Sequence, residues 1–333
     1  MPKKSFRDAA LTDLRRVPQL PAEFDNDPVI CAAWLYYEEH MTQDEVAQRI
    51  GISRASVNNL LQAARTQGVV EISVAPRHLQ AVRRARLIRS RFGIENCLIV
   101  PDDDGRRPDY ERVGQAGARF LADRLRPDDV LGVSWGRTVL ALSGALVARA
   151  LPGVSVVQVT GSAIGTYRFS AELCASNIAN RIGARCIHLH APGIVSHAEV
   201  KKMLMREPSL IQQFQIIASC NRIVFGVGSV ASSSTAFETG FLSEAEARPY
   251  IKRGAVAVLA GRFLDAGGAA ILCELDDRMI GMTVAEIRAV PDRICVAAGP
   301  EKVAPLRALF AGGFVTSLVT DQPTAAALLE EAA

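Results

Sequence analysis

Residues 42–67 read Thr-Gln-Asp-Glu-Val-Ala-Gln-Arg-Ile-Gly-Ile-Ser-Arg-Ala-Ser-Val-Asn-Asn-Leu-Leu-Gln-Ala-Ala-Arg-Thr-Gln. Val46, Ala47 and Ile50 recur at the spacing of one apolar face of a short helix. Gly51 follows at a point where a tight turn needs backbone freedom. Ser53 is then a ready N-cap for a second helix. This order of helix, glycine turn and helix predicts a helix-turn-helix, the motif with which many proteins read DNA.

The second helix has one face for the core and one face for DNA. Val57, Leu60, Leu61 and Ala64 form its expected buried stripe. The polar side chains off this stripe are free to meet DNA, because Asn can bond adenine, Arg can bond guanine, and Ser and Thr suit phosphates. The expected DNA-binding residues are Thr42, Gln43, Ser53, Arg54, Ser56, Asn58 and Asn59.

Two flanking segments extend this unit. A preceding amphipathic helix is expected to cover the pair with Ile30, Ala33, Trp34, Tyr37 and Met41. The alternation in residues 69–74 (Val-Val-Glu-Ile-Ser-Val) is typical of a short strand, which would make the unit winged.

Local charge separates a DNA reader from an ordinary helical hairpin. Residues 53–91 contain eight arginines and one acidic residue, Glu71, whereas the whole chain carries a net charge of only +3. A basic surplus beside a reading helix is the electrostatic pattern expected for nucleic-acid binding.

Length and composition indicate a soluble protein of about two domains. The chain has 333 residues, of which 49% are hydrophobic and 22% charged. Residues 1–29 are polar and do not resemble a signal peptide, and no run is long enough for a transmembrane helix. The seven dispersed cysteines, without a Cys-x-x-Cys pair, predict reduced core thiols in a cytoplasmic protein with no metal site and no cofactor.

The expected domains follow from these patterns. A linker helix is expected where Leu79, Val82, Leu87 and Ile88 share a face, and its arginines either contact phosphates or solvate an exposed helix. The boundaries are a flexible tail over 1–27, the winged helix-turn-helix over 28–76, the linker helix over 77–92, and an effector and oligomerisation domain over 93–333.

From Cys97 onward, β-rich runs alternate with amphipathic stretches. This alternation predicts a mainly parallel, Rossmann-like sheet covered by helices on both faces. The expected strands are Cys97–Val100, Val130–Ser134, Val154–Val159, Arg185–Leu189, Ile223–Phe225, Val256–Leu259, Ala270–Glu274, Ile294–Ala297 and Thr316–Val319. The expected helices include residues 111–125, 137–150, 170–182, 302–311 and 323–332.

Several of these strands lead into loops of small residues. Small residues let backbone amides approach a ligand, and helix N-termini beyond them favour anions such as phosphate. Arg137 and Lys302 add positive charge, and Asp265 can accept hydroxyl hydrogen bonds, so a polar phosphorylated small molecule fits the set. Each loop alone can equally be a routine turn. Gly226-Val-Gly228 does not complete a dinucleotide fingerprint, because Ala231 holds the third glycine position.

The ordered set of motifs resembles the SorC family of bacterial sugar-responsive regulators over roughly residues 29–331. The motifs that carry the resemblance are Trp34-Leu-Tyr-Tyr37, Met41-Thr-Gln-Asp-Glu-Val-Ala47, Trp135-Gly-Arg-Thr138, Gly226-Val-Gly-Ser229, Gly261-Arg-Phe-Leu-Asp265, Gly299-Pro-Glu-Lys302 and Leu318-Val-Thr-Asp321.

This resemblance implies a domain similar to phosphosugar isomerases, a homodimer or homotetramer on operator DNA, and a sugar, polyol or sugar-phosphate effector. It places a phosphate at Gly136, Arg137, Thr138 and Lys302, and a hydroxyl-bearing end near Gly161, Ser162 and Asp265; Gly228 lies in another of the ligand loops. Many relatives have Arg where this chain has Asn59, so their operator sequences do not transfer to it.

The expected function is a DNA-binding regulator, a repressor of a carbohydrate or polyol catabolic operon, with no enzymatic activity. The alternative is a sugar-phosphate isomerase or deaminase, which needs a base at the substrate carbon. Candidate bases are Asp265, Asp321 and the pair His188 and His190, but the sequence contains no recognisable set of nucleophile and base.

Overall fold

The computed structural model describes residues 22–24, 26–72, 76–103, 105–163, 169–231, 234–238 and 240–330. The chain divides into two compact units, Met1–Ala75 and Pro76–Ala333, and each is described by itself. Of the tail expected over residues 1–27, only the short 3-10 helix η2 (Ala22–Phe24), Asn26 and Asp27 lie within the described residues. No helix among the described residues combines the length and apolar character needed to cross a membrane.

Three α-helices form most of the part of the first unit that the structure describes. They are α2 (Pro28–Tyr37), α3 (Gln43–Ile50) and α4 (Arg54–Thr66). A capping box opens α3, in which the side chains of Thr42 and Glu45 each accept the other residue's backbone N–H. Gly51 ends α3 with a φ of +75°, the left-handed conformation that glycine adopts without strain. The predicted helix-turn-helix is therefore formed by local signals.

The core of this unit matches the prediction on α4 and matches it only in part on α2. Val57, Leu60, Leu61 and Ala64 are all buried in α4. On α2, Ala33 is buried and Tyr37 packs against the core as predicted, but Ile30 and Trp34 are exposed, and Cys31, Ala32 and Leu35 are buried in their place. Because α2 is apolar on nearly every side, its composition does not reveal which face packs on α4.

The predicted wing is not formed by the part of its segment that the structure describes. Residues 69–72 are in turns and irregular backbone rather than a strand. Ser73 and Val74 lie outside the described residues.

A seven-stranded parallel sheet organises the second unit, in the order β1-β10-β9-β5-β2-β3-β4. Its strands are β1 (Asn96–Val100), β2 (Val130–Val133), β3 (Ser155–Gln158), β4 (Arg185–Ile187), β5 (Arg222–Phe225), β9 (Asp292–Val296) and β10 (Ser317–Asp321). The chain winds outward from β2 to β4 and then returns to β5 on the other side of β2. The winding direction therefore reverses between β2 and β5, the place where open α/β sheets bind ligands.

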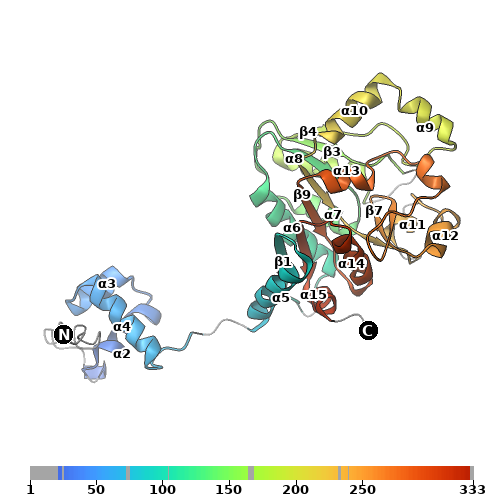
Figure 1. Ribbon diagram of the computed structural model, residues 1–333. Coiled ribbons are helices and arrows are strands. Elements are labelled where there is room, and N and C mark those ends of the chain that lie inside the picture. Colours follow the sequence, from blue (N-terminus) through green and yellow to red (C-terminus); the bar gives the residue numbers. More distant parts are fainter. Residues whose placement is uncertain are drawn as a thin grey trace, which may run out of the picture. The chain divides into compact units, whose positions relative to one another are not determined.

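Helices cover both faces of this sheet, as predicted (Figure 1). One face carries α6 (Asp109–Arg124), α7 (Arg137–Ala145) and α8 (Ala171–Ile182). The opposite face carries α5 (Pro76–Phe92), α10 (Pro208–Ala218), α13 (Val284–Ala289), α14 (Val303–Ala311) and α15 (Gln322–Leu329). The short α9 (Ala198–Leu204) precedes α10 and contributes no fully buried residue.

A second, smaller sheet departs from the prediction. It is antiparallel and contains β6 (Gly228–Ser229), β7 (Ala255–Leu259) and β8 (Arg262–Asp265), flanked by α11 (Thr235–Glu238) and α12 (Glu244–Lys252). The strand expected over Val256–Leu259 is present, but it pairs here rather than in the parallel sheet. Ala260 and Gly261 both have positive φ, which is the geometry of a tight hairpin turn between β7 and β8.

The strand expected over Ala270–Glu274 is wrong. Ala270 makes only an isolated bridge to Leu264, and residues from Glu274 form the 3-10 helix η3 (Glu274–Asp277). The Asp276 carboxylate accepts the backbone N–H of Cys273 at 2.9 Å and pairs with Arg262 at 3.2 Å. These tertiary contacts hold the segment in a turn.

The helix expected over 77–92 forms as α5 but packs as part of the second unit. It lies beside β1 and α15 (Figure 1), with Ala81 and Ile88 buried in the core. Leu79, Val82 and Leu87, which share the predicted apolar face, are exposed instead.

Candidate functional site

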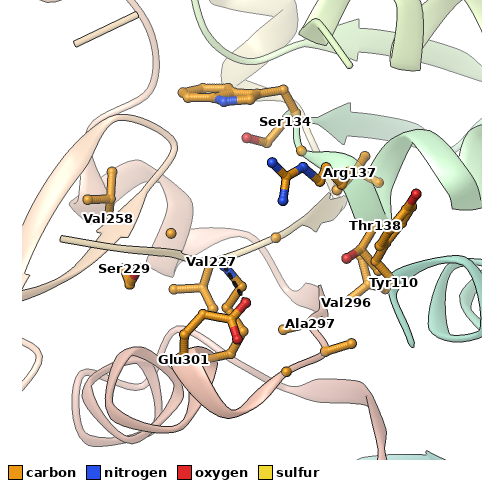
Figure 2. A pocket seen from close by; sticks show the side chains of 18 of the residues that line it. Tyr110, Ser134, Arg137, Thr138, Val227, Ser229, Val258, Val296, Ala297 and Glu301 are labelled. Carbon is orange, nitrogen blue, oxygen red and sulfur yellow. Dashed lines mark ion pairs between the residues drawn. The ribbon is translucent and has the colours of Figure 1, made fainter. Parts of the chain in front are cut away.

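A cavity of about 390 Å³ lies at the carboxyl ends of β2, β5 and β9, which are neighbours in the sheet. Each strand contributes the loop that follows it, namely Ser134–Thr138, Gly226–Ser229 and Ala297–Lys302. Val258 and Gly261 of the small sheet also line the cavity, as do Asp109 and Tyr110 at the start of α6. Figure 2 shows Val258 and Tyr110 on different sides of it. The cavity therefore occupies the point where the sheet changes winding direction.

Glycine shapes the two loops from which helices start. Gly136 precedes α7 with a φ of +135°, and Gly299 precedes the 3-10 helix η4 (Pro300–Lys302) with a φ of +111°. A Cβ on Gly136 would meet nothing within 4 Å, so the backbone conformation, and not crowding, calls for glycine there. No side chain caps α7, which leaves its first N–H groups directed at the cavity mouth as potential anion donors.

A buried carboxylate supports the loop after β9. Asp321, at the end of β10, accepts the Gly299 N–H at 2.8 Å and the Thr324 hydroxyl at 2.8 Å. Its other oxygen accepts the Thr324 N–H at 2.7 Å and so caps α15. Asp321 and Thr324 have no solvent exposure. The position of Lys302 therefore depends on a network behind the cavity wall.

The cations of the cavity already have carboxylate partners. The guanidinium of Arg137 contacts the carboxylate of Glu238 on α11 and lies 5.9 Å from the centre of the Phe169 ring. Lys302 Nζ lies 3.5 Å from Glu301 Oε1. In Figure 2, Arg137 and Glu301 reach toward the cavity from opposite sides.

A second, smaller hollow adjoins the first at Trp135, whose ring packs at a tilt against Phe241 with 4.7 Å between the ring centres. Its volume of about 20 Å³ suits about one water molecule or hydroxyl group. Glu172 is its acidic residue, and the Thr160 hydroxyl, which is buried and lacks a hydrogen-bond partner within the described residues, is another of its polar groups.

Glu172 is held in its ionised form. Burial favours the protonated carboxyl, but hydrogen bonds from Ser162, Ser170 and Gln158 outweigh it and lower the pKa of Glu172 below its ordinary value. Gln158 Nε2 lies 3.2 Å from Glu172 Oε1. Sequence reasoning missed Glu172, although its place in the first turn of α8 after the Ser170 cap was visible.

The predicted effector residues fall into two groups. Five of them line the main cavity, namely Gly136, Arg137, Thr138, Gly228 and Lys302. Gly161 lines the small hollow, where a Cβ would lie 2.6 Å from the Pro192 oxygen, so glycine is needed for backbone packing. Ser162 lies beside that hollow, 3.5 Å from Gln158.

Asp265 is the predicted residue that the structure places elsewhere. It lines neither cavity, and its carboxylate accepts the Ala269 N–H at 2.9 Å in the turn that follows β8. An Asp whose side chain accepts a backbone N–H of the turn that it begins cannot be told from a ligand-binding Asp by sequence, because both stand at the end of a strand.

The candidate catalytic bases are not arranged for proton transfer. Asp321 is sealed behind the cavity wall, and His188 lies beyond the end of β4, 3.2 Å from Ser176 and 3.3 Å from Gln158. His190 is exposed. Among the described residues, no three His, Cys, Asp or Glu side chains gather as metal ligands.

In the first unit, the predicted DNA-binding residues sit around the start of α3 and α4. Thr42, Ser53, Arg54, Asn58 and Asn59 are exposed, and Gln43 and Ser56 are half-buried. Thr42 and Ser53 are also helix caps, so their hydroxyls serve the fold as well. Arg54 lies 3.4 Å from Asp44 in an ion pair on the surface.

Arg54→Ala is expected to weaken operator binding by about five- to thirtyfold, since one base or phosphate contact contributes about 1–2 kcal/mol. The pair with Asp44 is exposed, so its loss should leave folding unchanged. Fluorescence anisotropy on operator and unrelated duplexes at fixed salt would measure both affinities. Equal loss on all duplexes would assign Arg54 to phosphate, and unchanged affinity would remove it from the interface.

The family model described as "Putative sugar-binding domain" matches residues 77–330. The transcriptional regulator YjhU of Escherichia coli K12, itself uncharacterised, is 33% identical over 92% of this chain and 95% of its own length. The chain belongs to the SorC family of sugar-binding transcriptional regulators.

Another curated regulator and a solved structure are also similar to this chain. The deoxyribonucleoside regulator of Bacillus subtilis 168 is 29% identical over 90% of this chain and 96% of its own length. The full-length sorbitol operon regulator SorC of Klebsiella pneumoniae has the same fold, with a TM-score of 0.70 over 91% of this chain and 98% of that protein at 23% identity. This SorC-family chain is a sugar-responsive, DNA-binding regulator, and the regulator prediction is confirmed over the enzyme alternative.

Proposed function

We propose that this regulator represses a carbohydrate or polyol catabolic operon and that a sugar or polyol phosphate in the main cavity relieves the repression. The observation that carries the proposal is the cavity itself, where three strand-end loops converge with Arg137 and Lys302. The phosphate would meet Arg137, Lys302 and the free amides at the start of α7. The hydroxyl-bearing end would extend past Trp135 toward Glu172, because an ionised carboxylate accepts hydroxyl hydrogen bonds.

The proposal also includes the oligomeric state of the regulator and its location in the cell. We expect a homodimer or homotetramer in the cytoplasm, because a helix-turn-helix protein reads two half-sites at a fixed spacing. A ligand that binds one arrangement of the subunits more tightly than the other shifts the protein toward that arrangement. The resulting change in DNA affinity cannot exceed the ratio of the ligand's affinities for the two arrangements. A rotation of the subunits that alters the half-site spacing would release the operator.

Footprinting of the chain's own upstream DNA tests this proposal. The full-length protein would be titrated alone and with a panel of sugars, polyols and their phosphate esters. A protected site that is lost with particular phosphate esters, and kept with their unphosphorylated forms, is the expected result. A footprint that no member of the panel changes would contradict the effector assignment, and a missing footprint would contradict the operator assignment.

Lys302→Ala is expected to raise the effector concentration needed for half-release of DNA by about ten- to a hundredfold, because a charge-assisted hydrogen bond contributes about 1.5–3 kcal/mol. Operator affinity without effector should be unchanged. Gel-shift titrations would measure both quantities, with the exposed Lys252→Ala on α12 as a matched control. An unchanged midpoint in Lys302→Ala would remove the phosphate from this end of the cavity.

A further inference from the structure

The lining of the main cavity contains carboxylate side chains as well as cationic ones. Its described lining residues include two cations, Arg137 and Lys302, and three carboxylates, Asp109, Glu238 and Glu301. A site that binds a phosphate ester ordinarily presents an excess of positive charge. Here Glu238 and Glu301 already neutralise the positive charge of Arg137 and Lys302, so an incoming anion has to compete with these carboxylates.

One of the two ion pairs in the cavity joins separate parts of the fold. Lys302 and Glu301 are adjacent in sequence, whereas Arg137 and Glu238 are 101 positions apart and connect α7 to α11. Both carboxylate oxygens of Glu238 accept hydrogen bonds from Arg137 Nη2. The Glu238 oxygens therefore accept hydrogen bonds from the same guanidinium that the oxygens of a bound phosphate would use.

The exposure of this pair makes it replaceable. The side chains of Arg137 and Glu238 are 46% and 38% exposed, so water screens their attraction. In exposed ion pairs of this kind, the paired state of the two side chains is favoured over the separated state by less than about tenfold. A phosphate monoester carries up to two negative charges and three acceptor oxygens, and it can use the α7 amides as well. It should displace the single carboxylate.

We propose that Glu238 is a built-in competitor for the anionic group of the effector. In the ligand-free protein Glu238 holds Arg137, and the effector anion takes its place and releases α11 from α7. This inference rests on the proposed function, since it requires an anionic effector in the main cavity.

The position of Glu238 gives the exchange a structural consequence. Glu238 ends α11, and Phe241 and Leu242, three and four residues later, are buried in the core of the small sheet. Phe241 packs at a tilt against Trp135, which belongs to the same loop after β2 as Arg137. The ion pair thus links that loop to the small-sheet side of the cavity, and anion binding would break it while the aromatic contact remains.

The opposite role for Glu238 predicts the opposite result. A carboxylate that only orients Arg137 for the ligand would help anions to bind, so its removal would weaken binding. A competing carboxylate hinders anions, so its removal strengthens binding. The sign of one affinity change therefore decides between the two roles.

Titration calorimetry of the full chain with inorganic phosphate, and with the phosphate esters that relieve the footprint, provides this test. Glu238→Gln is expected to bind these anions about three- to tenfold more tightly than the wild type. Unphosphorylated sugars should bind both proteins equally. The exposed Glu244→Gln on α12 removes the same charge outside the cavity and should match the wild type. Glu238→Ala should reproduce the tightening and guards against an effect of the introduced amide.

Each result separates this inference from the proposed function. If wild type binds phosphate esters and both Glu238 variants bind them equally or more weakly, the competitor role is wrong and the proposed function stands. If the wild type binds no phosphate or phosphate ester, the proposed phosphate effector and the competitor role both fall. Equal tightening in Glu244→Gln would attribute the effect to overall charge and would also overturn the competitor role.

Discussion

Leu61→Ala is expected to abolish operator binding while effector binding stays at the wild-type level. Leu61 is 2% exposed in α4 and packs in the small core shared by α2, α3 and α4. A Leu→Ala change at such a site costs about 2–5 kcal/mol. Because a small helical unit has only a few kcal/mol of stability in total, most molecules would lose the folded helix-turn-helix.

The separation of the two units makes this prediction specific. The effector cavity lies entirely within Pro76–Ala333, which has its own core clusters. Gel shifts on the operator and calorimetry with the effector would measure the two functions in one preparation. Ile72→Ala, a change of similar chemistry at a 62% exposed residue, is the control and should bind operator normally. Operator binding within twofold of wild type in Leu61→Ala would contradict the assigned core.

Local signals made the helix-turn-helix predictable from sequence. The Gly51 turn and the Ser53 cap act within a few residues of where they stand, and both are found in the structure. The Thr42 cap on α3 is equally local, although the sequence predicted only a DNA-binding role for Thr42. The face of α2 was not predictable, because an apolar helix can pack on several sides and only its contacts with α4 select Cys31 and Leu35. The same applies to α5, where Ile88 is buried but Leu87 is exposed.

The parallel sheet was predictable to the extent that strands alternate with helices. What the pattern did not contain was the small antiparallel sheet. Its hairpin turn at Ala260 and Gly261 lines the main cavity, but in sequence it looks like a strand-to-helix loop, because a small residue and a glycine follow a strand in both cases. Pairing partners are tertiary information, and so β7 was assigned to the wrong sheet.

For the cavity too, local sequence predicted some of the lining residues but not the residues that they contact. Residues at strand ends, such as Arg137 and Lys302, were identifiable because parallel strands end at a common edge. Their partners were not. Glu238 lies 101 positions from Arg137, and Asp321 reaches Gly299 from a different strand, so no local spacing records either contact.

Asp321→Asn is expected to lower the stability of the second unit and to remove most of the response to effector. Asn keeps one acceptor oxygen for the Thr324 N–H, but it places an NH₂ group against the Gly299 N–H and the Thr324 hydroxyl. The Gly299 N–H keeps the Thr324 hydroxyl oxygen, at 2.9 Å, as an acceptor, but the Thr324 hydroxyl loses its own acceptor, and a buried donor left unsatisfied costs about 1–3 kcal/mol. Because Gly299 begins the loop that carries Lys302, its displacement should also raise the half-release concentration of effector by about a hundredfold.

Denaturant unfolding and gel-shift titration of the same protein would separate the two effects. Thr324→Ser retains the hydroxyl that donates to Asp321 and accepts from Gly299, so it should keep the wild-type midpoint, whereas Thr324→Val should shift it in the direction of Asp321→Asn. Operator binding without effector should persist in all three variants, because none of these residues lies in the first unit. An Asp321→Asn protein with lowered stability but an unchanged effector midpoint would show that Asp321 serves the fold alone. The loop after β9 would then be positioned by its own glycine geometry.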